Sequence, residues 1–353
     1  MRQSFDRIVE RRRTDCLKWD GIEARYGVTG EDLLPVWVAD MEFRPPEALV
    51  QALVRRAEHA VWGYPAVPEA YRQAICGWML RRHNWMVKPE WIVSAPGVVC
   101  AVNLLIRTFT NRGDAVILQP PVYPPFFRGV EENGCRLLTN PLRYEGGRYT
   151  MDFDDLEKKL DHAKLLILCT PHNPVGRVWT REELVRLGEL CLAHEVIVIS
   201  DEIHFDLVFS GHRHTVFASL GDAFAQQCAV CTSPSKTFNL AGLQPGVVVI
   251  PNPKIRHDFQ RTLRACGLGE PNVFCLEAVK AAYLHGEPWL EDLLVYLEEN
   301  HAFLRRYVAE NIPQLRVVQA EGTFLAWVDC RAIGLEPKVL EQLLLTKARL
   351  VLN

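Results

Sequence analysis

Short apolar runs alternate with amphipathic stretches between residues 92 and 250, and this alternation restricts the possible folds more than any other feature of the chain. The runs LLILC, VIVIS, CAVC and GVVVI contain almost no polar residues. Strands buried on both faces have this composition, and they occur mostly in parallel sheets with helices on each side. The sequence therefore predicts an α/β fold with a mainly parallel sheet covered by helices.

The size and charge of the chain exclude several classes of protein. With 353 residues, 48% of them hydrophobic, the chain can bury a substantial core in two domains or one large one. The net charge is -3 without a long basic run, so nucleic-acid binding is not expected. No apolar stretch reaches the ~20 residues of a membrane span, and the N-terminal segment lacks the apolar core of a signal peptide. We expect no membrane partner either.

The 11 cysteines are an odd number scattered through predicted helices and strands. That distribution is typical of reduced, buried thiols in a cytoplasmic protein. Cys228 and Cys231 form a C-x-x-C pair, but in a strand they point to opposite faces, which favours packing over zinc binding. His212 and His214 are interpreted as loop residues. No metal site is expected.

Periodicity predicts further elements around this region. Thr180 and Glu183 have the spacing of a capping box, which predicts a helix to about His194. After Pro271 the sequence is helical, then strand-like in RVVQA and TFLAWVDC, and helical again from Pro337. Nearer the N-terminus it predicts a helix over residues 4–20, a strand over 33–43, and helices over 47–60 and 69–85.

Polar and aromatic residues follow several predicted strands directly, where ligands of open α/β sheets bind. Gly97, Val98 and Val99 begin a helix without a side-chain cap, and their backbone N–H groups suit an anion. A simple strand-to-helix turn explains Gly97 equally well. Tyr123 stands between two proline pairs and is interpreted as a rigid aromatic platform rather than a surface polyproline segment.

Three more candidates follow the next two strands. Asn173 precedes Pro174, a common turn pair that says little alone. Asp201 follows five apolar residues, and a carboxylate in that position needs a cationic or N–H partner. His204 is three residues further on and suits the same ligand, although a core histidine with satisfied hydrogen bonds is the alternative.

The segment SPSKTFNLAG, residues 233–242, places a lysine after two serines at a predicted strand end. A lysine that forms a Schiff base needs a fixed position, a partly desolvated amine and an anion-holding group nearby. Ser233, Ser235 and Lys236 can supply all three, while a solvated surface lysine is the alternative.

Together these residues describe a site for pyridoxal 5'-phosphate. The phosphate would meet the amides of residues 97–99 and the hydroxyls of Ser233 and Ser235, and Tyr123 would stack on the ring. Asp201 would keep the pyridine nitrogen protonated, which makes the ring an electron sink. Asn173 and His204 would reach the ring oxygen, and Lys236 would hold the aldehyde and act as the catalytic base. We expect Asp40, Tyr64, Tyr123 and Asn173 to contact the substrate.

The chain also resembles a known family, in ordered blocks from near residue 4 to its last residue. These blocks are RRRTDCLKWD, WVADMEF, WGYPAVPEAY, PPVYPPFF, PHNPVGRVW, SDEIHFDLVF, SPSKTFNLAGLQ and EGTFLAWVDCRA. The chain is similar to the fold-type I, pyridoxal-phosphate-dependent aminotransferase superfamily (class I/II), and within it to C–S lyases of the MalY/PatB type, the cystathionine β-lyases.

The resemblance implies an architecture. It comprises a large cofactor-binding domain, residues 46–285, with a mainly parallel seven-stranded sheet, and a small α+β domain of residues 1–45 and 286–353. It also implies an obligate homodimer in which Tyr64 reaches the phosphate in the neighbouring subunit's site.

The resemblance further implies a reaction, and alternatives stay open. A C–S β-lyase would cleave cystathionine or related cysteine S-conjugates to pyruvate, ammonia and a thiol. An aminotransferase would use the same ring site, and a cofactor-binding regulatory protein with little turnover is the candidate of another class.

Two departures from the wider superfamily bear on this choice. Gln244 stands where class I aminotransferases commonly carry a phosphate-binding arginine, as is usual in the lyase-like group. Relatives also continue beyond residue 353 with a segment that carries the arginine binding the substrate carboxylate. We therefore expect the polypeptide to bind the cofactor but to turn over amino acids poorly.

Overall fold

The computed structural model of the chain describes residues 5–353, which fall into two compact units. Unit 2 consists of Pro45–His301 and Val318–Trp327, and unit 1 consists of the chain up to Arg44 together with Ala302–Val317 and Val328–Asn353. The assignment of a cofactor domain to residues 46–285 stays a prediction.

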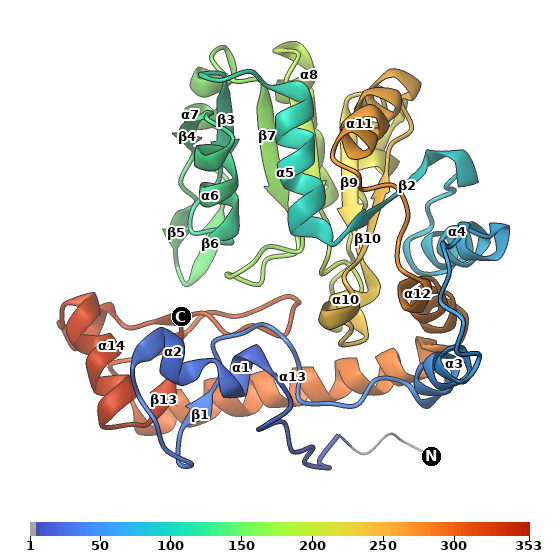
Figure 1. The fold of residues 1–353 in the computed structure, drawn as a ribbon. Helices are drawn as coiled ribbons and strands as arrows, with labels where there is room; N and C mark the ends of the chain where they lie inside the picture. The colour runs from blue at the N-terminus through green and yellow to red at the C-terminus, as the bar shows by residue number, and fades with distance from the viewer. Residues whose placement is uncertain (1–4) are drawn as a thin grey trace. The chain divides into compact units, whose positions relative to one another are not determined.

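A seven-stranded sheet forms the centre of unit 2 (Figure 1). Only β10 runs against its neighbours, and the other six strands share one direction. The expected mainly parallel, seven-stranded sheet is confirmed. In spatial order the strands are β2 (Ile92–Pro96), β10 (Pro245–Val249), β9 (Cys228–Thr232), β8 (Ile197–Asp201), β7 (Leu165–Cys169), β3 (Ala115–Leu118) and β4 (Arg136–Thr139).

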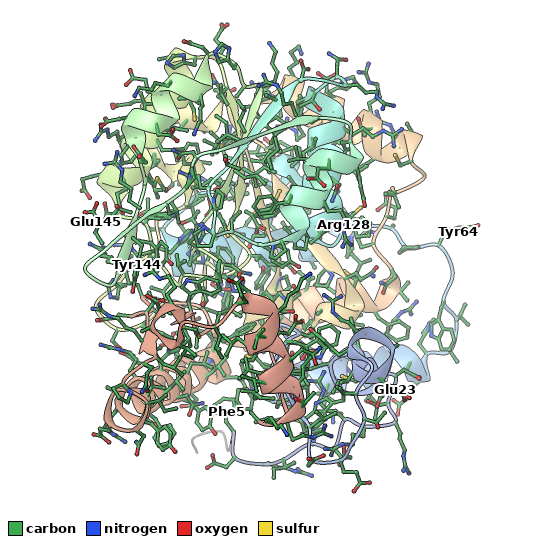
Figure 2. All side chains as sticks on the ribbon, turned by 90° about the vertical axis from the view of Figure 1, so that its left-hand side faces the viewer. Phe5, Glu23, Tyr64, Arg128, Tyr144 and Glu145 are labelled. Atoms are coloured by element: carbon green, nitrogen blue, oxygen red, sulfur yellow. The ribbon has the colours of Figure 1, made fainter. Side chains whose placement is uncertain are left out.

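Helices cover both faces of this sheet, as the apolar runs predict. Residues in β3, β7, β9 and β10 are buried throughout, because each strand has helices on either side. Helices α5 (Val98–Phe109), α6 (Pro125–Glu132) and α11 (Pro253–Ala265) lie on one face and α8 (Arg181–Ala193) on the other (Figures 1 and 2). The capping box of Thr180 and Glu183 at the start of α8 is confirmed.

Further helices of unit 2 pack beside the sheet. Helix α12 (Val273–His285) contacts both α3 (Glu47–Glu58) and α4 (Glu69–His83). Trp78 of α4 stacks on Tyr283 of α12, with ring centroids 5.1 Å apart. The remaining elements are the hairpin β5 (Arg143–Glu145) and β6 (Arg148–Thr150), helices α7 (Phe153–Leu160), α9 (Asp222–Ala225) and α10 (Pro234–Thr237), and the 3₁₀ turns η1 (Pro89–Trp91), η2 (Phe217–Leu220) and η3 (Ala241–Leu243).

Unit 1 is smaller and has its own apolar core of Ile22, Leu33, Trp37, Leu345 and Val351. Helix α13 (Glu287–Asn311) runs from unit 2 into unit 1 along the chain. The other elements are α1 (Leu17–Asp20), α2 (Ile22–Tyr26), α14 (Pro337–Thr346), the turn η4 (Arg331–Ile333), the parallel pair β1 (Leu34–Pro35) and β13 (Leu350–Val351), and the antiparallel pair β11 (Arg316–Val317) and β12 (Val328–Asp329).

The N-terminal predictions are partly wrong. The helix expected over residues 4–20 is reduced to α1, since the carboxylate of Asp20 accepts the backbone N–H groups of Arg13, Thr14 and Cys16 and holds them in a turn. Residue 4 lies outside the described residues. The strand expected over residues 33–43 is confined to β1, because the chain turns where Asp40 N–H donates to the Val38 carbonyl.

Within residues 5–353, no helix has the length and apolar character needed to cross a membrane.

Candidate active site at the carboxyl ends of the strands

Lys236 lies in α10, the four-residue helix that follows β9 at the end of the sheet (Figure 1). Ser233 caps this helix: its hydroxyl accepts the Ser235 N–H at 2.9 Å and donates to the Pro245 carbonyl at 2.6 Å. The Ser233 hydroxyl thus donates its hydrogen to the carbonyl of Pro245 in β10. A contact between Ser233 and a phosphate stays a prediction.

Asp201 is the last residue of β8 and lies between Cys169 of β7 and Cys231 of β9. Its side chain is buried, and one carboxylate oxygen accepts the Ile203 N–H at 3.1 Å. Burial raises the pKa of Asp201 to about 7, with a further contribution from the charge of Glu202, while Lys236 acts in the opposite direction. Asp201 is a buried acid that a nearby cation would ionise.

His204 lies in the loop after β8 and is also buried. Burial, together with the positive charge of Lys236, lowers the pKa of His204 to about 3, so the ring is neutral. Its Nδ1 atom is buried without a hydrogen-bond partner. The ring meets Phe324 edge-on, with centroids 5.7 Å apart. An unpartnered ring nitrogen in this position is available to a ligand.

Tyr123 and Asn173 reach the same group of residues from β3 and β7. Burial raises the pKa of the Tyr123 hydroxyl, and the nearby carboxylate of Asp201 raises it further. The backbone N–H of Asn173 donates to the Cys169 sulfur at 3.3 Å. Electrostatic interactions therefore connect Tyr123, Asp201, His204 and Lys236, which the sequence separates by more than 100 residues.

Gly97 joins the end of β2 to α5, with a φ of +85°. The helix has no side-chain cap, and a Cβ atom placed on Gly97 would meet nothing within 4 Å. Gly246 of β10 lies directly against this turn, because a Cβ on Gly246 would stand 2.9 Å from the Gly97 backbone. The Gly97 N–H donates to the Ala95 carbonyl at 2.9 Å, so the N–H groups of Val98 and Val99, at the uncapped start of α5, are the ones that suit an anion.

These groups fit pyridoxal 5'-phosphate chemically. The uncapped start of α5 suits its phosphate, and the buried carboxyl of Asp201 suits a protonated ring nitrogen. The free Nδ1 of His204 and the amine of Lys236 suit the polar groups of the ring. No cluster of His, Cys, Asp or Glu suited to a metal ion occurs within residues 5–353.

Asp40 and Tyr64 are the other two residues expected to contact the substrate. Asp40 belongs to unit 1, where Arg11 donates to both of its carboxylate oxygens, at 2.9 and 2.8 Å, and the Lys18 amine lies 3.5 Å from one of them. Tyr64 lies between α3 and α4, fully exposed, and its side chain points away from the rest of unit 2 (Figure 2). Their contact with substrate stays a prediction.

Two residues that contact the site residues or their neighbours, Asp206 and Phe324, were not predicted from the sequence. The side chain of Asp206 is buried and accepts a hydrogen bond from Thr237, the residue after Lys236, at 2.8 Å. The signal was present in SDEIHFD, where a second acidic residue stands among apolar ones. Phe324, which contacts His204, had no recognisable signal, because its position depends on a chain segment over 100 residues away.

Comparison with known proteins gives a consistent result. The family described as "Aminotransferase class I and II" matches residues 36–352. The chain is 46% identical over 352 residues to cystathionine beta-lyase PatB of Bacillus subtilis, covering 99% of this chain and 90% of that protein.

Two solved structures have the same fold. Cystalysin from Treponema denticola, which contains pyridoxal 5'-phosphate, superimposes with a TM-score of 0.96 at 34% identity, covering 99% of this chain and 90% of that one. The PLP-bound C–S lyase from Staphylococcus hominis has a TM-score of 0.92 at 30% identity, with 99% and 89% covered.

Proposed function

This chain belongs to the aminotransferase class I and II family, and from that premise we propose that it is a pyridoxal 5'-phosphate-dependent carbon–sulfur β-lyase. Its substrate would be cystathionine or a related cysteine S-conjugate, and its products would be pyruvate, ammonia and a thiol. The observation that carries this proposal is the 46% identity to a cystathionine beta-lyase over 99% of the chain.

The proposed cofactor, when bound, supplies an electron-withdrawing ring that stabilises negative charge at the α-carbon of an amino acid. Asp201 would hold a proton on the ring nitrogen, since a buried carboxylate is stabilised by a cation at hydrogen-bond distance. The N–H groups of Val98 and Val99 and the hydroxyl of Ser235 would bind the phosphate, whereas the Gly97 N–H and the Ser233 hydroxyl donate to the Ala95 and Pro245 carbonyls. Tyr123 would pack against the ring, and Asn173 and His204 would contact its oxygen.

Lys236 has two proposed roles. It would bind the cofactor covalently, and once the amino group of the substrate has displaced it, its released Nζ atom would accept the α-proton. Lys236 is half-buried in α10, directly after β9. Loss of the α-proton allows the bond between the β-carbon and sulfur to break. The sulfur leaves as a thiolate and takes up a proton to become the thiol, and water hydrolyses the released three-carbon enamine to pyruvate and ammonia.

Tyr64 supports a proposed homodimer with shared sites. Its side chain is fully exposed, and its neighbours Val61 and Trp62 are exposed as well. Apolar and aromatic side chains gathered on one exposed segment mark a protein contact. We propose that Tyr64 contacts the phosphate in a second copy of the chain. The 11 free thiols favour a cytoplasmic location.

The test is to incubate the purified protein and cofactor with cystathionine, and to measure pyruvate and free thiol. We expect both products in equal amounts without an added keto acid, and neither with Lys236→Ala. Formation of a new amino acid only when a keto acid is added would assign aminotransferase activity instead. Absence of both activities, with the cofactor bound, would overturn the enzymatic proposal.

A further inference from the structure

The helix that carries Lys236 is held at both ends by buried hydroxyl groups. Helix α10 has only four residues, and the Phe238 N–H to Pro234 carbonyl contact, 2.9 Å, is a hydrogen bond of its own turn. So short a helix does not fix its own direction. At its start Ser233 donates to the Pro245 carbonyl, and at its end Thr237 donates to Asp206.

The carboxylate of Asp206 has hydrogen-bond partners in both α4 and α10. Its side chain is fully buried, and it accepts the Trp78 Nε1–H at 3.1 and 3.2 Å and the Thr237 hydroxyl at 2.8 Å. The Nε2 atom of His83 lies 2.9 Å from its other oxygen. Burial lowers the pKa of His83, so this ring is neutral and donates from Nε2. Trp78 and His83 of α4 thus fix the position of Asp206, and Asp206 in turn fixes the end of α10 through Thr237.

The same loop carries Asp206 and two of the proposed cofactor contacts. Asp201 accepts the Ile203 N–H, the Phe205 N–H donates to the Glu202 carbonyl at 3.0 Å, and the Leu207 N–H donates to the His204 carbonyl at 2.9 Å. These bonds make residues 201–207 a compact turn. A displacement of Asp206 relative to α10 would therefore also displace Asp201 and His204 relative to Lys236.

We propose that Asp206 is a positioning residue for Lys236: through the hydroxyl of Thr237 it fixes the amine against Asp201 and His204. This inference rests on the proposed function, because it assigns Asp206 a part in the chemistry of that lysine. The bond between Thr237 and Asp206 is a direct side-chain link between α10 and the loop of residues 201–207.

The variant that tests this link is Thr237→Val, which keeps the shape of the side chain and removes its hydroxyl. Misplacing a reacting group by about 1 Å costs up to roughly a hundredfold in rate. We expect the bond between cofactor and Lys236 to form about tenfold to a hundredfold more slowly in this variant, and kcat to fall more than KM rises. Thr237→Ser, which retains the hydroxyl, should restore both rates.

A matched control removes a similar hydroxyl elsewhere. The hydroxyl of Thr108, near the end of α5, donates to the Leu104 carbonyl at 2.6 Å and lies 2.9 Å from the hydroxyl of Thr262 in α11. Thr108 stands about 15 Å along the helix from its first residue, since an α-helix rises 1.5 Å per residue. Thr108→Val loses a comparable hydrogen bond, so a general effect of destabilisation would appear in both variants.

The experiment adds pyridoxal 5'-phosphate to cofactor-free protein and traps the covalent bond with borohydride at timed intervals. Mass spectrometry then measures the modified Lys236 peptide, and thermal midpoints are recorded for each variant. Slow trapping in Thr237→Val with normal trapping in Thr237→Ser and Thr108→Val is the expected result. Equal trapping rates in all variants would overturn the inference.

Two further outcomes are decisive. If wild-type protein yields no modified Lys236, the proposed function itself is wrong, and the inference falls with it. If Thr237→Val does not fold, Thr237→Ala removes the hydroxyl without placing a methyl group against Asp206. Trapping at the wild-type rate in that variant would equally overturn the positioning role.

Discussion

At Asp201 a carboxyl group is buried before any ligand arrives. Burial raises its pKa to about 7, well above the ordinary value of 3.8. A folded-state pKa above the unfolded one means that the folded protein binds more protons, so stability falls as the pH rises from about 4 through about 7. Above about pH 7, the buried carboxylate of Asp201 therefore destabilises the cofactor-free protein, and the proposed cofactor would offset this cost.

Asp201→Asn should make the cofactor-free protein more stable at pH 8, by up to about 4 kcal/mol, since it removes this buried ionising group. Thermal unfolding of both proteins between pH 4 and pH 8 checks this expectation. The two curves should converge near pH 4, where Asp201 is protonated. The variant should also bind pyridoxal 5'-phosphate more weakly, and unchanged affinity would contradict the role of Asp201.

At the scale of elements, the close approach of β10 to the turn at Gly97 is the most demanding feature. A Cβ atom on Gly246 would lie 2.6 Å from the Ala95 carbonyl oxygen and 2.9 Å from the Gly97 nitrogen. These neighbours are backbone atoms of β2 and its turn, so they cannot move aside as a flexible side chain would.

Gly246→Ala should therefore destabilise the protein by about 1–3 kcal/mol and weaken cofactor binding, because it displaces the start of α5. Gly242→Ala is the control, since a Cβ there meets nothing within 4 Å. Denaturant unfolding and cofactor titration of both variants measure the difference. Equal behaviour of the two would mean that β10 and β2 separate without cost.

The segment 318–327 depends on a buried ion pair. Glu321 accepts Arg177 Nε at 2.9 Å inside the unit and Arg148 Nη2 at 3.0 Å at its surface. The side chain of Arg177 is 1% exposed and that of Arg148 55%. The two arginines share one carboxylate but differ in burial.

Arg177→Met should cost about 3–5 kcal/mol of stability, because it removes the buried cation that pairs with both Glu321 and Glu183 and leaves the Val178 N–H as the inner donor to Glu321. Arg148→Met should cost less than about 1 kcal/mol, as exposed ion pairs do. Urea unfolding of both variants separates the two cases. Similar losses would show that burial does not distinguish these partners.

The elements could largely be predicted from the sequence, since their apolar runs, their helical periodicity and the capping box at Thr180 are local patterns. Cofactor contacts such as Asp201 and Lys236 were proposed because each directly follows an apolar run. Asp206 and Phe324 were not, because their roles depend on partners distant in the chain. The predicted N-terminal helix was wrong because the Asp20 carboxylate accepts backbone N–H groups that a helix would otherwise use. The periodicity of apolar residues does not reveal such hydrogen bonds.

At the scale of the whole molecule, the exposed Tyr64 supports the proposed exchange of residues between two copies. Subunits that lack Tyr64 and subunits that lack Lys236 would then have complementary defects. A mixed dimer would contain one site with both defects and one with neither.

Coexpression of Tyr64→Ala and Lys236→Ala chains should therefore restore lyase activity to roughly a quarter of the wild-type level, since half of randomly formed dimers are mixed. Each variant expressed alone should be nearly inactive. Pyruvate formation by the purified mixture is the measurement. No recovery in confirmed mixed dimers would place Tyr64 in its own subunit's site or outside both.

The antiparallel strand β10 has a consequence for the order in which the chain folds. Strand β2 has β10 as its neighbour in the sheet, yet some 150 residues separate them along the chain. The pairing of these two strands also brings the turn at Gly97 close to Pro245, whose carbonyl accepts a hydrogen bond from the Ser233 hydroxyl. During synthesis the parallel strands β3, β4, β7, β8 and β9 can assemble before β10 is made, so β2 has no partner in the sheet until then. The turn at Gly97 and the helix that carries Lys236 then meet late, when β10 inserts between β2 and β9.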